Sequence, residues 1–184
     1  MPEIPETQLA YIAGLVDGEG CISIDKSATG VRRYASPGAG LILRVRIYNC
    51  SKPMIDFVNQ VWPGYVRKIT WKSNPKHLDA YSWELLGKRA AIFLNTILPF
   101  LITKYDEANA LIVFGETLDA SWKCSSDSGG GLQLTPEAVR LRRLAVTALR
   151  YAKSRNSMRK SQSWSLEEVI TRVKANWPPP STCV

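Results

Sequence analysis

The chain has 184 residues, of which 45% are hydrophobic, and its 24 Lys and Arg against 16 Asp and Glu give a formal net charge of +8. This length and hydrophobic content suit one domain with a proper core. The longest apolar run, from Ile92 to Ile102, is interrupted by Asn95 and Pro99 and is too short to span a bilayer, which argues against a membrane partner. The positive charge favours a polyanionic partner, usually nucleic acid; a basic structural protein without a specific target is the alternative.

Hydrophobic periodicity and turn residues predict alternating helices and strands. In chain order, we expect a helix over residues 6–17, strands over 21–27 and 41–49, a helix over 51–60, strands over 64–71 and 80–86, and helices over 88–98, 103–121, 135–154 and 165–177. A long basic connection over 28–40 and a polar loop over 72–79 join the strands of each pair. Ser51 and Thr135 are the expected N-caps of two helices.

The predicted strands alternate apolar with polar or basic side chains, which is typical of a sheet with one buried and one exposed face. The order α-β-β-α-β-β-α therefore predicts an α+β fold in which helices cover one face of a four-stranded antiparallel sheet. We expect a single domain over residues 1–184, with a core over roughly 6–121 and a C-terminal helical extension over roughly 133–177. The later part of the chain contains no second copy of the first helix and its acidic end.

The cysteines stand at positions 21, 50, 124 and 183 and show no CxxC spacing. This distribution weighs against a zinc site or a disulfide framework and favours reduced thiols. We therefore expect an intracellular protein, in an organelle or in a prokaryotic cytoplasm.

The most informative segment reads YIAGLVDGEG and runs from Tyr11 to Gly20. It predicts an apolar helix whose last turn is rich in glycine and carries two carboxylates, Asp17 and Glu19. Glycine inside a helix costs about 1 kcal/mol relative to alanine, so small residues there indicate that another backbone approaches closely. Carboxylates at the foot of such a helix pair are suited to hold a divalent metal ion. The small residues of this helix are Ala10, Ala13, Gly14 and Gly18.

The run from Ile12 to Gly20 resembles the motif of the LAGLIDADG homing endonucleases. Gly18 stands where Ala is usual and Glu19 where Asp is usual, and both changes keep a small residue followed by a carboxylate. The resemblance extends from residue 9 to roughly residue 115 and implies an αββαββα core with a saddle-shaped antiparallel sheet. It also implies a site-specific endonuclease that cleaves both strands of a long pseudo-palindromic DNA target with Mg²⁺ or Mn²⁺.

The same resemblance assigns the metal to the carboxylate of Glu19 and the carbonyl of Gly18. One motif gives one site, and cutting two strands requires two, so the implied assembly is a homodimer on double-stranded DNA. The implied dimer interface consists of Ala10, Ala13, Gly14 and Asp17. Asp17 has a second interpretation, as an acceptor for backbone amides.

Two further polar residues match the family by local pattern. Asn49 ends the strand over 41–49, where family members carry a polar residue that positions water; a strand-end turn residue is the other interpretation. Lys104 lies in PFLITKYDEAN, which resembles a family segment whose Lys reaches the catalytic centre, where a cation stabilises charge on the phosphate. A surface Lys at a helix start is the alternative, and Lys52 is a weaker second candidate.

The polar faces of the predicted strands form the candidate DNA-binding surface. Arginine reads guanine in the major groove, and hydroxyl or carboxylate groups read other base edges, whereas basic loop residues contact phosphate. The candidate DNA-binding residues are Ser23, Asp25, Arg32, Arg33, Arg44, Arg46, Tyr48, Arg67, Trp71, Lys72, Ser82 and Glu84.

A non-cleaving protein of the same fold is the alternative, either an intron RNA maturase, with intron RNA as its partner, or a DNA-binding regulator. Glu19, Asn49 and Lys104 together favour the enzyme, because a pure binding protein need not keep all three.

Overall fold

The computed structural model describes residues 4–26, 40–70, 79–119, 121–123 and 132–156. Its elements are α1 (Glu6–Glu19), β1 (Gly20–Lys26), β2 (Leu41–Asn49), α2 (Lys52–Val61), β3 (Tyr65–Ile69), β4 (Ala80–Leu86), α3 (Gly87–Ile97), the 3₁₀ turn η2 (Leu98–Phe100), α4 (Tyr105–Glu116), β5 (Ser121–Lys123), β6 (Leu132–Leu134) and α5 (Pro136–Asn156).

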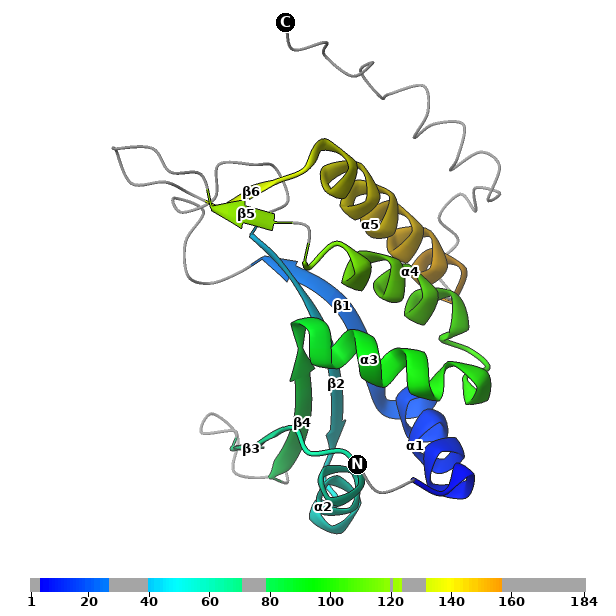
Figure 1. The fold of residues 1–184 in the computed structure, drawn as a ribbon. Helices are drawn as coiled ribbons and strands as arrows, with labels where there is room; N and C mark the ends of the chain where they lie inside the picture. Colours follow the sequence, from blue (N-terminus) through cyan, green and yellow to red (C-terminus); the bar gives the residue numbers. More distant parts are fainter. Residues whose placement is uncertain (1–3, 27–39, 71–78, 120, 124–131, 157–184) are drawn as a thin grey trace, which may run out of the picture.

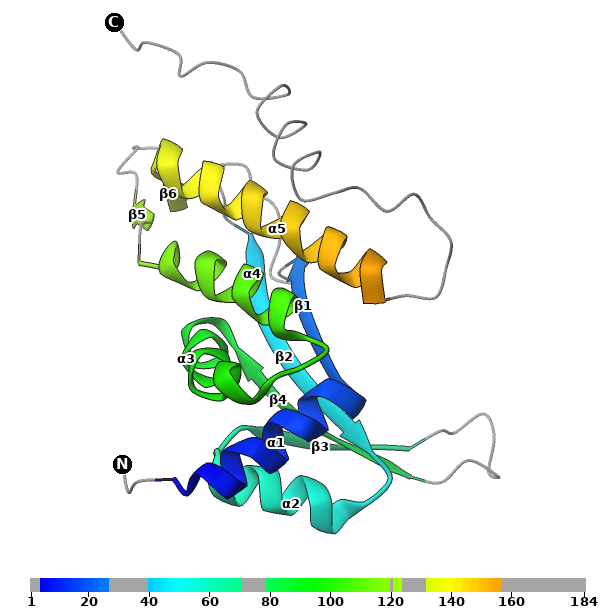
Figure 2. The ribbon, with the colours of Figure 1, turned by 90° about the vertical axis from the view of Figure 1, so that its right-hand side faces the viewer.

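The main sheet has four strands in the order β1-β2-β4-β3, and every neighbouring pair is antiparallel. Helices α1, α3 and α4 lie on one side of this twisted sheet, and α5 packs along α4 on the side away from the strands (Figure 1 and Figure 2). The predicted α+β fold and its antiparallel sheet are therefore confirmed.

Alternation in the strands separates a buried face from an exposed one, as predicted. Leu43, Val45 and Ile47 of β2 are fully buried, whereas the residues between them are only partly buried. The buried face joins apolar residues of α1 to α5 in one core cluster, which includes Ala145 and Leu149 of α5. α5 thus shares the core of the sheet, although the boundaries of the single domain remain a prediction.

Three aromatic side chains anchor the centre of this core. Trp83 is fully buried, and its indole N–H donates a hydrogen bond of 3.0 Å to the carbonyl of Trp62. Phe93 contacts both indoles edge-on, with ring centroids 5.1 Å and 5.2 Å apart. The polar N–H of Trp83 is therefore satisfied inside the core, as a buried donor must be.

Several predicted boundaries differ from the structure. α1 continues two residues beyond its predicted end, to Glu19, and β1 begins at the next residue. The helix predicted over 103–121 is shorter in the structure, where α4 spans Tyr105–Glu116. The small hairpin of β5 and β6 was not predicted. The predicted helix over 165–177, residues 28–39 of the basic connection and residues 72–78 of the polar loop lie outside the described residues.

The two predicted N-caps behave differently. Thr135 accepts a hydrogen bond of 3.1 Å from the N–H of Ala138, as a capping side chain does. Ser51 occupies the N-cap position of α2 but makes no side-chain capping bond. No helix within the described residues is long and apolar enough to cross a membrane.

Candidate active site

α1 presents two different faces. Its buried side carries Leu9, Ile12, Ala13 and Val16, whereas Ala10, Gly14 and Gly18 are exposed at a spacing of four residues. Because residues four apart lie on one side of a helix, these three form an outward-facing row of small residues. The structure corrects the predicted place of Ala13 in a dimer interface: Ala13 is fully buried among the chain's own core residues.

The glycines of this region have two kinds of surroundings. A Cβ atom added at Gly14 or Gly18 would meet nothing within 4 Å among the described residues. A Cβ atom at Gly20 would lie 2.4 Å from the carbonyl oxygen of Val16. Of these three glycines, packing among the described residues requires only the one at position 20, which lets the strand begin directly after the helix.

The carboxylate of Asp17 binds its own chain. Its Oδ2 accepts a hydrogen bond of 2.7 Å from the N–H of Ile102, and its Oδ1 accepts one of 2.9 Å from the N–H of Lys104. Partial burial raises the pKa of this carboxyl group, but hydrogen bonds from the backbone and from Thr103 outweigh that effect, and the net pKa is lowered. Asp17 therefore acts as an acceptor for backbone amides and fixes the segment before α4 to the end of α1.

Lys104 lies against the same helix end. It is the N-cap residue of α4, and its Nζ donates a hydrogen bond to the carbonyl oxygen of Asp17. That oxygen belongs to the last turn of α1, where carbonyl groups lack intrahelical partners. The Lys104 ammonium is thus held at the carbonyl of Asp17, the residue two positions before Glu19 in the sequence.

Glu19 is the last residue of α1, and its side chain is exposed. Within the described part of the chain, its carboxylate has no hydrogen-bond or ion-pair partner. A helix carries a partial negative charge of about −0.5 at its C-terminus, so an anionic side chain there is electrostatically unfavourable in the absence of a cation. This helix end is therefore a favourable position for a positive ion.

A single copy of the chain offers few other ligands. No group of three or more His, Cys, Asp or Glu residues that could hold a metal ion occurs among the described residues. The acidic ligand at this helix end is Glu19, because both carboxylate oxygens of Asp17 accept backbone hydrogen bonds.

Asn49 stands at the same end of the sheet as Glu19. Gly20 pairs with Ile47 in the β1–β2 register, so the end of β2 runs past the foot of α1. The side-chain Oδ1 of Asn49 accepts a hydrogen bond of 2.7 Å from the N–H of Ser51. This bond orients the amide and leaves its Nδ2 group as the end that can contact a water molecule.

The exposed face of the sheet is ordered by the strand register. Arg46 lies between Cys21 of β1 and Glu84 of β4, and Ser82 lies between Tyr48 of β2 and Arg67 of β3. Ser23 lies opposite Arg44, and Asp25 is the next residue of β1 on the same face. The register thus brings together the predicted DNA-binding residues that the structure describes, which are Ser23, Asp25, Arg44, Arg46, Tyr48, Arg67, Ser82 and Glu84. Ser82 is nevertheless buried, at 2% exposure, so its side chain is not open to a ligand in the way that the sequence predicted.

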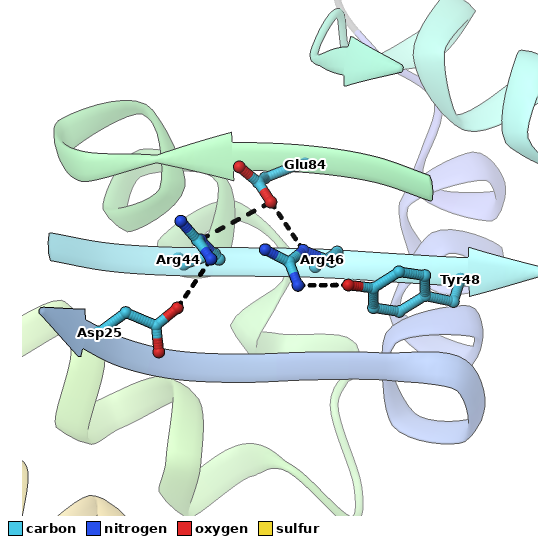
Figure 3. Close-up of polar contacts among 5 residues, drawn as sticks. All are labelled: Asp25, Arg44, Arg46, Tyr48 and Glu84. Atoms are coloured by element: carbon cyan, nitrogen blue, oxygen red, sulfur yellow. Dashed lines mark hydrogen bonds and ion pairs between the residues drawn. The ribbon is translucent and has the colours of Figure 1, made fainter. Parts of the chain in front are cut away.

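Five of these residues form one connected network (Figure 3). Arg44 Nη1 lies 2.9 Å from Asp25 Oδ2, and Arg44 Nε lies 3.6 Å from Glu84 Oε2. Arg46 Nε donates a hydrogen bond of 2.6 Å to the same Glu84 oxygen, and Arg46 Nη1 donates one to the hydroxyl of Tyr48. Burial lowers the pKa of Arg46, but Glu84 and Tyr48 outweigh this effect and raise it.

The other candidates are placed apart from this network or are not described. Arg32, Arg33, Trp71 and Lys72 lie outside the described residues. Lys52 pairs with Asp56 at 2.5 Å within α2. The sequence prediction did not include Cys21 and Tyr65 on the candidate DNA-binding surface, although alternation along β1 and β3 would have placed both on that face.

Comparisons with known proteins bear on the fold. No family sequence model and no curated protein sequence matches the chain. The structure is similar to the homing endonuclease I-CvuI in complex with its target in the presence of Ca, with a TM-score of 0.56, 14% identity and coverage of 92% of this chain and 94% of that chain. It is also similar to the archaeal intron-encoded homing endonuclease I-Vdi141I complexed with DNA, with a TM-score of 0.53, 14% identity and coverage of 92% and 96%.

A third similar structure is the LAGLIDADG meganuclease I-CpaMI bound to uncleaved DNA. Here the TM-score is 0.51 and the identity 13%, and the match covers 96% of this chain but only 52% of that chain. Similarity at these identities establishes the fold. The chain therefore has the fold of the LAGLIDADG homing endonucleases, and the recognition of that fold from the motif is confirmed.

Proposed function

We propose that the chain is a site-specific homing endonuclease that, as a homodimer, cleaves both strands of a long pseudo-palindromic DNA target by metal-dependent phosphodiester hydrolysis. The observation that carries this proposal is the foot of α1. There Glu19 presents an exposed carboxylate, and Lys104 is bound to the carbonyl of Asp17 in the same helix turn, at the end of a sheet whose open face carries arginines.

Double-stranded DNA is the proposed ligand of the open sheet face. The chain's net charge of +8 favours a polyanion, and the similar structures of I-CvuI and I-Vdi141I are DNA complexes. Arginine, tyrosine, serine and carboxylate side chains on the face supply both donors and acceptors for base edges. This chemistry suits reading a sequence better than contacting phosphate alone.

The exposed row of small residues on α1 supports a homodimer. Gly14 and Gly18 each cost about 1 kcal/mol relative to alanine in a helix, yet neither is needed by contacts among the described residues. A second copy of α1 packed against this row would need both, because small residues let two helices approach closely. The match to I-CpaMI gives independent support, since nearly the whole of this chain covers about half of that one.

The residues present fit a divalent metal ion shared between two chains. One chain supplies a single free carboxylate at this position, and Mg²⁺ needs only one or two carboxylates together with substrate phosphate and water. We propose Glu19 and the Gly18 carbonyl of each chain as the ligands, with Mg²⁺ or Mn²⁺ as the ion. When bound, such an ion would lower the pKa of a water molecule and neutralise charge on the phosphate.

The chain's other residues would act around that centre. Lys104 places an ammonium group near the scissile phosphate, where it stabilises the negative charge that develops during hydrolysis. Asn49, fixed by the N–H of Ser51, contacts the attacking water through its amide. Asp17 keeps the segment that carries Lys104 against α1, so it is a positioning residue.

Cleavage of long duplex DNA by the full chain tests the proposal. A target recovered by selection from a library of randomised duplexes is incubated with the wild type and with Glu19→Gln, with Mg²⁺ and with EDTA. We expect cleavage of both strands by the wild type with Mg²⁺ and none by Glu19→Gln, which should still bind the duplex. Binding without cleavage by the wild type would instead favour a DNA-binding regulator, and selective binding of a structured RNA would favour a maturase.

A further inference from the structure

The charged groups at the centre of the open sheet face neutralise one another. Arg44 and Arg46 on β2 lie between two carboxylates, Asp25 on β1 and Glu84 on β4. Two positive and two negative charges leave this cluster with no formal net charge. A surface that binds DNA through phosphate alone would not place acidic groups here, because each one repels the backbone.

Glu84 is the residue that connects the two arginines. One of its oxygens, Oε2, accepts the hydrogen bond from Arg46 and also lies within ion-pair distance of Arg44. Its side chain is only 13% exposed, less than either arginine, at 27% for Arg44 and 21% for Arg46. Glu84 is therefore fixed under the two guanidinium groups rather than free to turn away from them.

The two arginines are not held equally. Arg46 donates to both Glu84 and Tyr48, so its guanidinium is fixed at two points and keeps three donors for a ligand. Arg44 Nε is a buried donor without a hydrogen-bond partner among the described residues. Leaving such a donor unsatisfied is unfavourable, so Arg44 is the arginine more easily drawn to an acceptor on DNA.

We propose that Glu84 determines sequence specificity by holding Arg44 and Arg46 away from phosphate, so that they engage only where base edges offer well-placed acceptors. Non-specific duplex then gains little from these arginines, because contacting phosphate means breaking the ion pairs. A duplex with guanine at the right position gains a bidentate contact from an arginine that is already oriented. This inference rests on the proposed function, since it assumes that the open face binds DNA.

The substitution Glu84→Gln tests this role. It keeps the shape of the side chain but removes the charge that holds both arginines. An arginine freed to contact one phosphate steepens the negative slope of log K against log[salt] by about 0.9, which corresponds to about an eightfold gain in affinity at 0.1 M salt relative to 1 M salt. We therefore expect Glu84→Gln to bind a random-sequence 30-base-pair duplex about tenfold more tightly than the wild type, with a steeper salt dependence.

The controls separate this effect from a general change in charge. Asp119→Asn also removes one carboxylate that is ion-paired, to Lys88 at 2.6 Å, but at the turn after α4 rather than on the sheet face. We expect it to change affinity for random duplex by less than twofold. Asp25→Asn removes the closer ion pair of Arg44, at 2.9 Å, but leaves Arg44 within 3.6 Å of Glu84. It should therefore have an intermediate effect, and it decides the question in the same way if Glu84→Gln does not fold.

Selection from a library of randomised duplexes is the second measurement. We expect sites recovered with Glu84→Gln to show weaker base preference at one position of each half-site than those recovered with the wild type, which a merely structural role would not produce. The inference is overturned if Glu84→Gln binds random duplex no more tightly than Asp119→Asn and selects the same sites. If the wild type itself binds no duplex, the proposed function fails instead.

Discussion

Gly14 is the position at which the proposed dimer can be tested against the stability of the single chain. A Cβ atom at this residue would meet nothing within 4 Å in the part of the chain that the structure describes. Gly14→Ala should therefore stabilise the folded monomer by about 0.5–1 kcal/mol, which is the usual gain for alanine over glycine within a helix. The same methyl group would enter the contact between two α1 helices, so the substitution should weaken dimerisation.

A larger side chain at the same position sharpens the contrast. Gly14→Leu inserts a branched side chain into a close helix contact, and overpacking of this kind costs about 1–3 kcal/mol at each site. Two-fold symmetry applies the cost twice, which gives about 2–6 kcal/mol and weakens the dimer by about thirtyfold or more. Sedimentation velocity over a concentration series measures the dissociation constant, and urea unfolding at a concentration below it measures the monomer.

Gly115 of α4 is the matched control for this experiment. A Cβ atom there would lie 2.5 Å from the Cβ atom of Ala91, inside the same chain. Gly115→Ala should therefore destabilise the monomer, whereas Gly14→Ala stabilises it. A Gly14→Leu variant that remains dimeric at the concentrations where the wild type does, and that still cleaves DNA, would refute the reasoning.

Three further substitutions have defined outcomes. Asp17→Asn should lower the free energy of unfolding by about 1–3 kcal/mol at pH 7, because a charged acceptor of two backbone N–H groups is lost. The folded-state pKa of Asp17 is lowered from 3.8. The difference in unfolding free energy between the variant and the wild type should therefore shrink as pH falls through that folded-state pKa. Thr117→Val removes the oxygen that accepts a 2.8 Å hydrogen bond from the buried Arg142, and should cost about 1–2 kcal/mol in urea unfolding. Glu19→Gln should change the unfolding free energy by less than about 0.5 kcal/mol, because its exposed side chain lacks a partner in the described residues, while cleavage is lost.

Each of these outcomes can fail in a recognisable way. A difference between Asp17→Asn and the wild type that stays constant from pH 7 to pH 2 would contradict the role given to its charge. Thr117→Ser, which keeps the hydroxyl group, is the control for Thr117→Val. A Glu19→Gln variant that is strongly destabilised would mean that this carboxylate supports the fold.

The helices and strands of the core could be predicted because their periodicity is local. The alternation in β2 and the glycine-rich end of α1 are visible in the sequence, and both have the expected places in the structure. The end of α1 was predicted two residues early because glycine normally terminates helices, whereas here Gly18 continues the helix. The added residues, Gly18 and Glu19, are exposed, but Asp17 in the same turn accepts hydrogen bonds from Ile102 and Lys104. Sequence propensity does not include such tertiary contacts.

The site was less accessible to sequence reasoning because its geometry depends on contacts between distant segments. The sequence could place Arg44, Arg46 and Glu84 on one face of a sheet, but not show that Glu84 joins the two arginines, since this requires the β2–β4 register. Nor could it decide between the two interpretations of Asp17. The hydrogen bonds from residues 102 and 104 lie more than 80 positions away and depend on where α4 begins.

The junction between α1 and β1 links the proposed recognition and cleavage functions. Because a side chain at Gly20 would overlap the Val16 carbonyl, only glycine lets β1 start immediately after the helix. Glu19 therefore directly precedes the first residue of β1, the strand that carries Ser23 and Asp25 on the open face. A duplex bound across that face would hold its phosphates in a fixed relation to the Glu19 carboxylate. An inserted residue at this junction would preserve both the helix and the sheet but separate binding from hydrolysis.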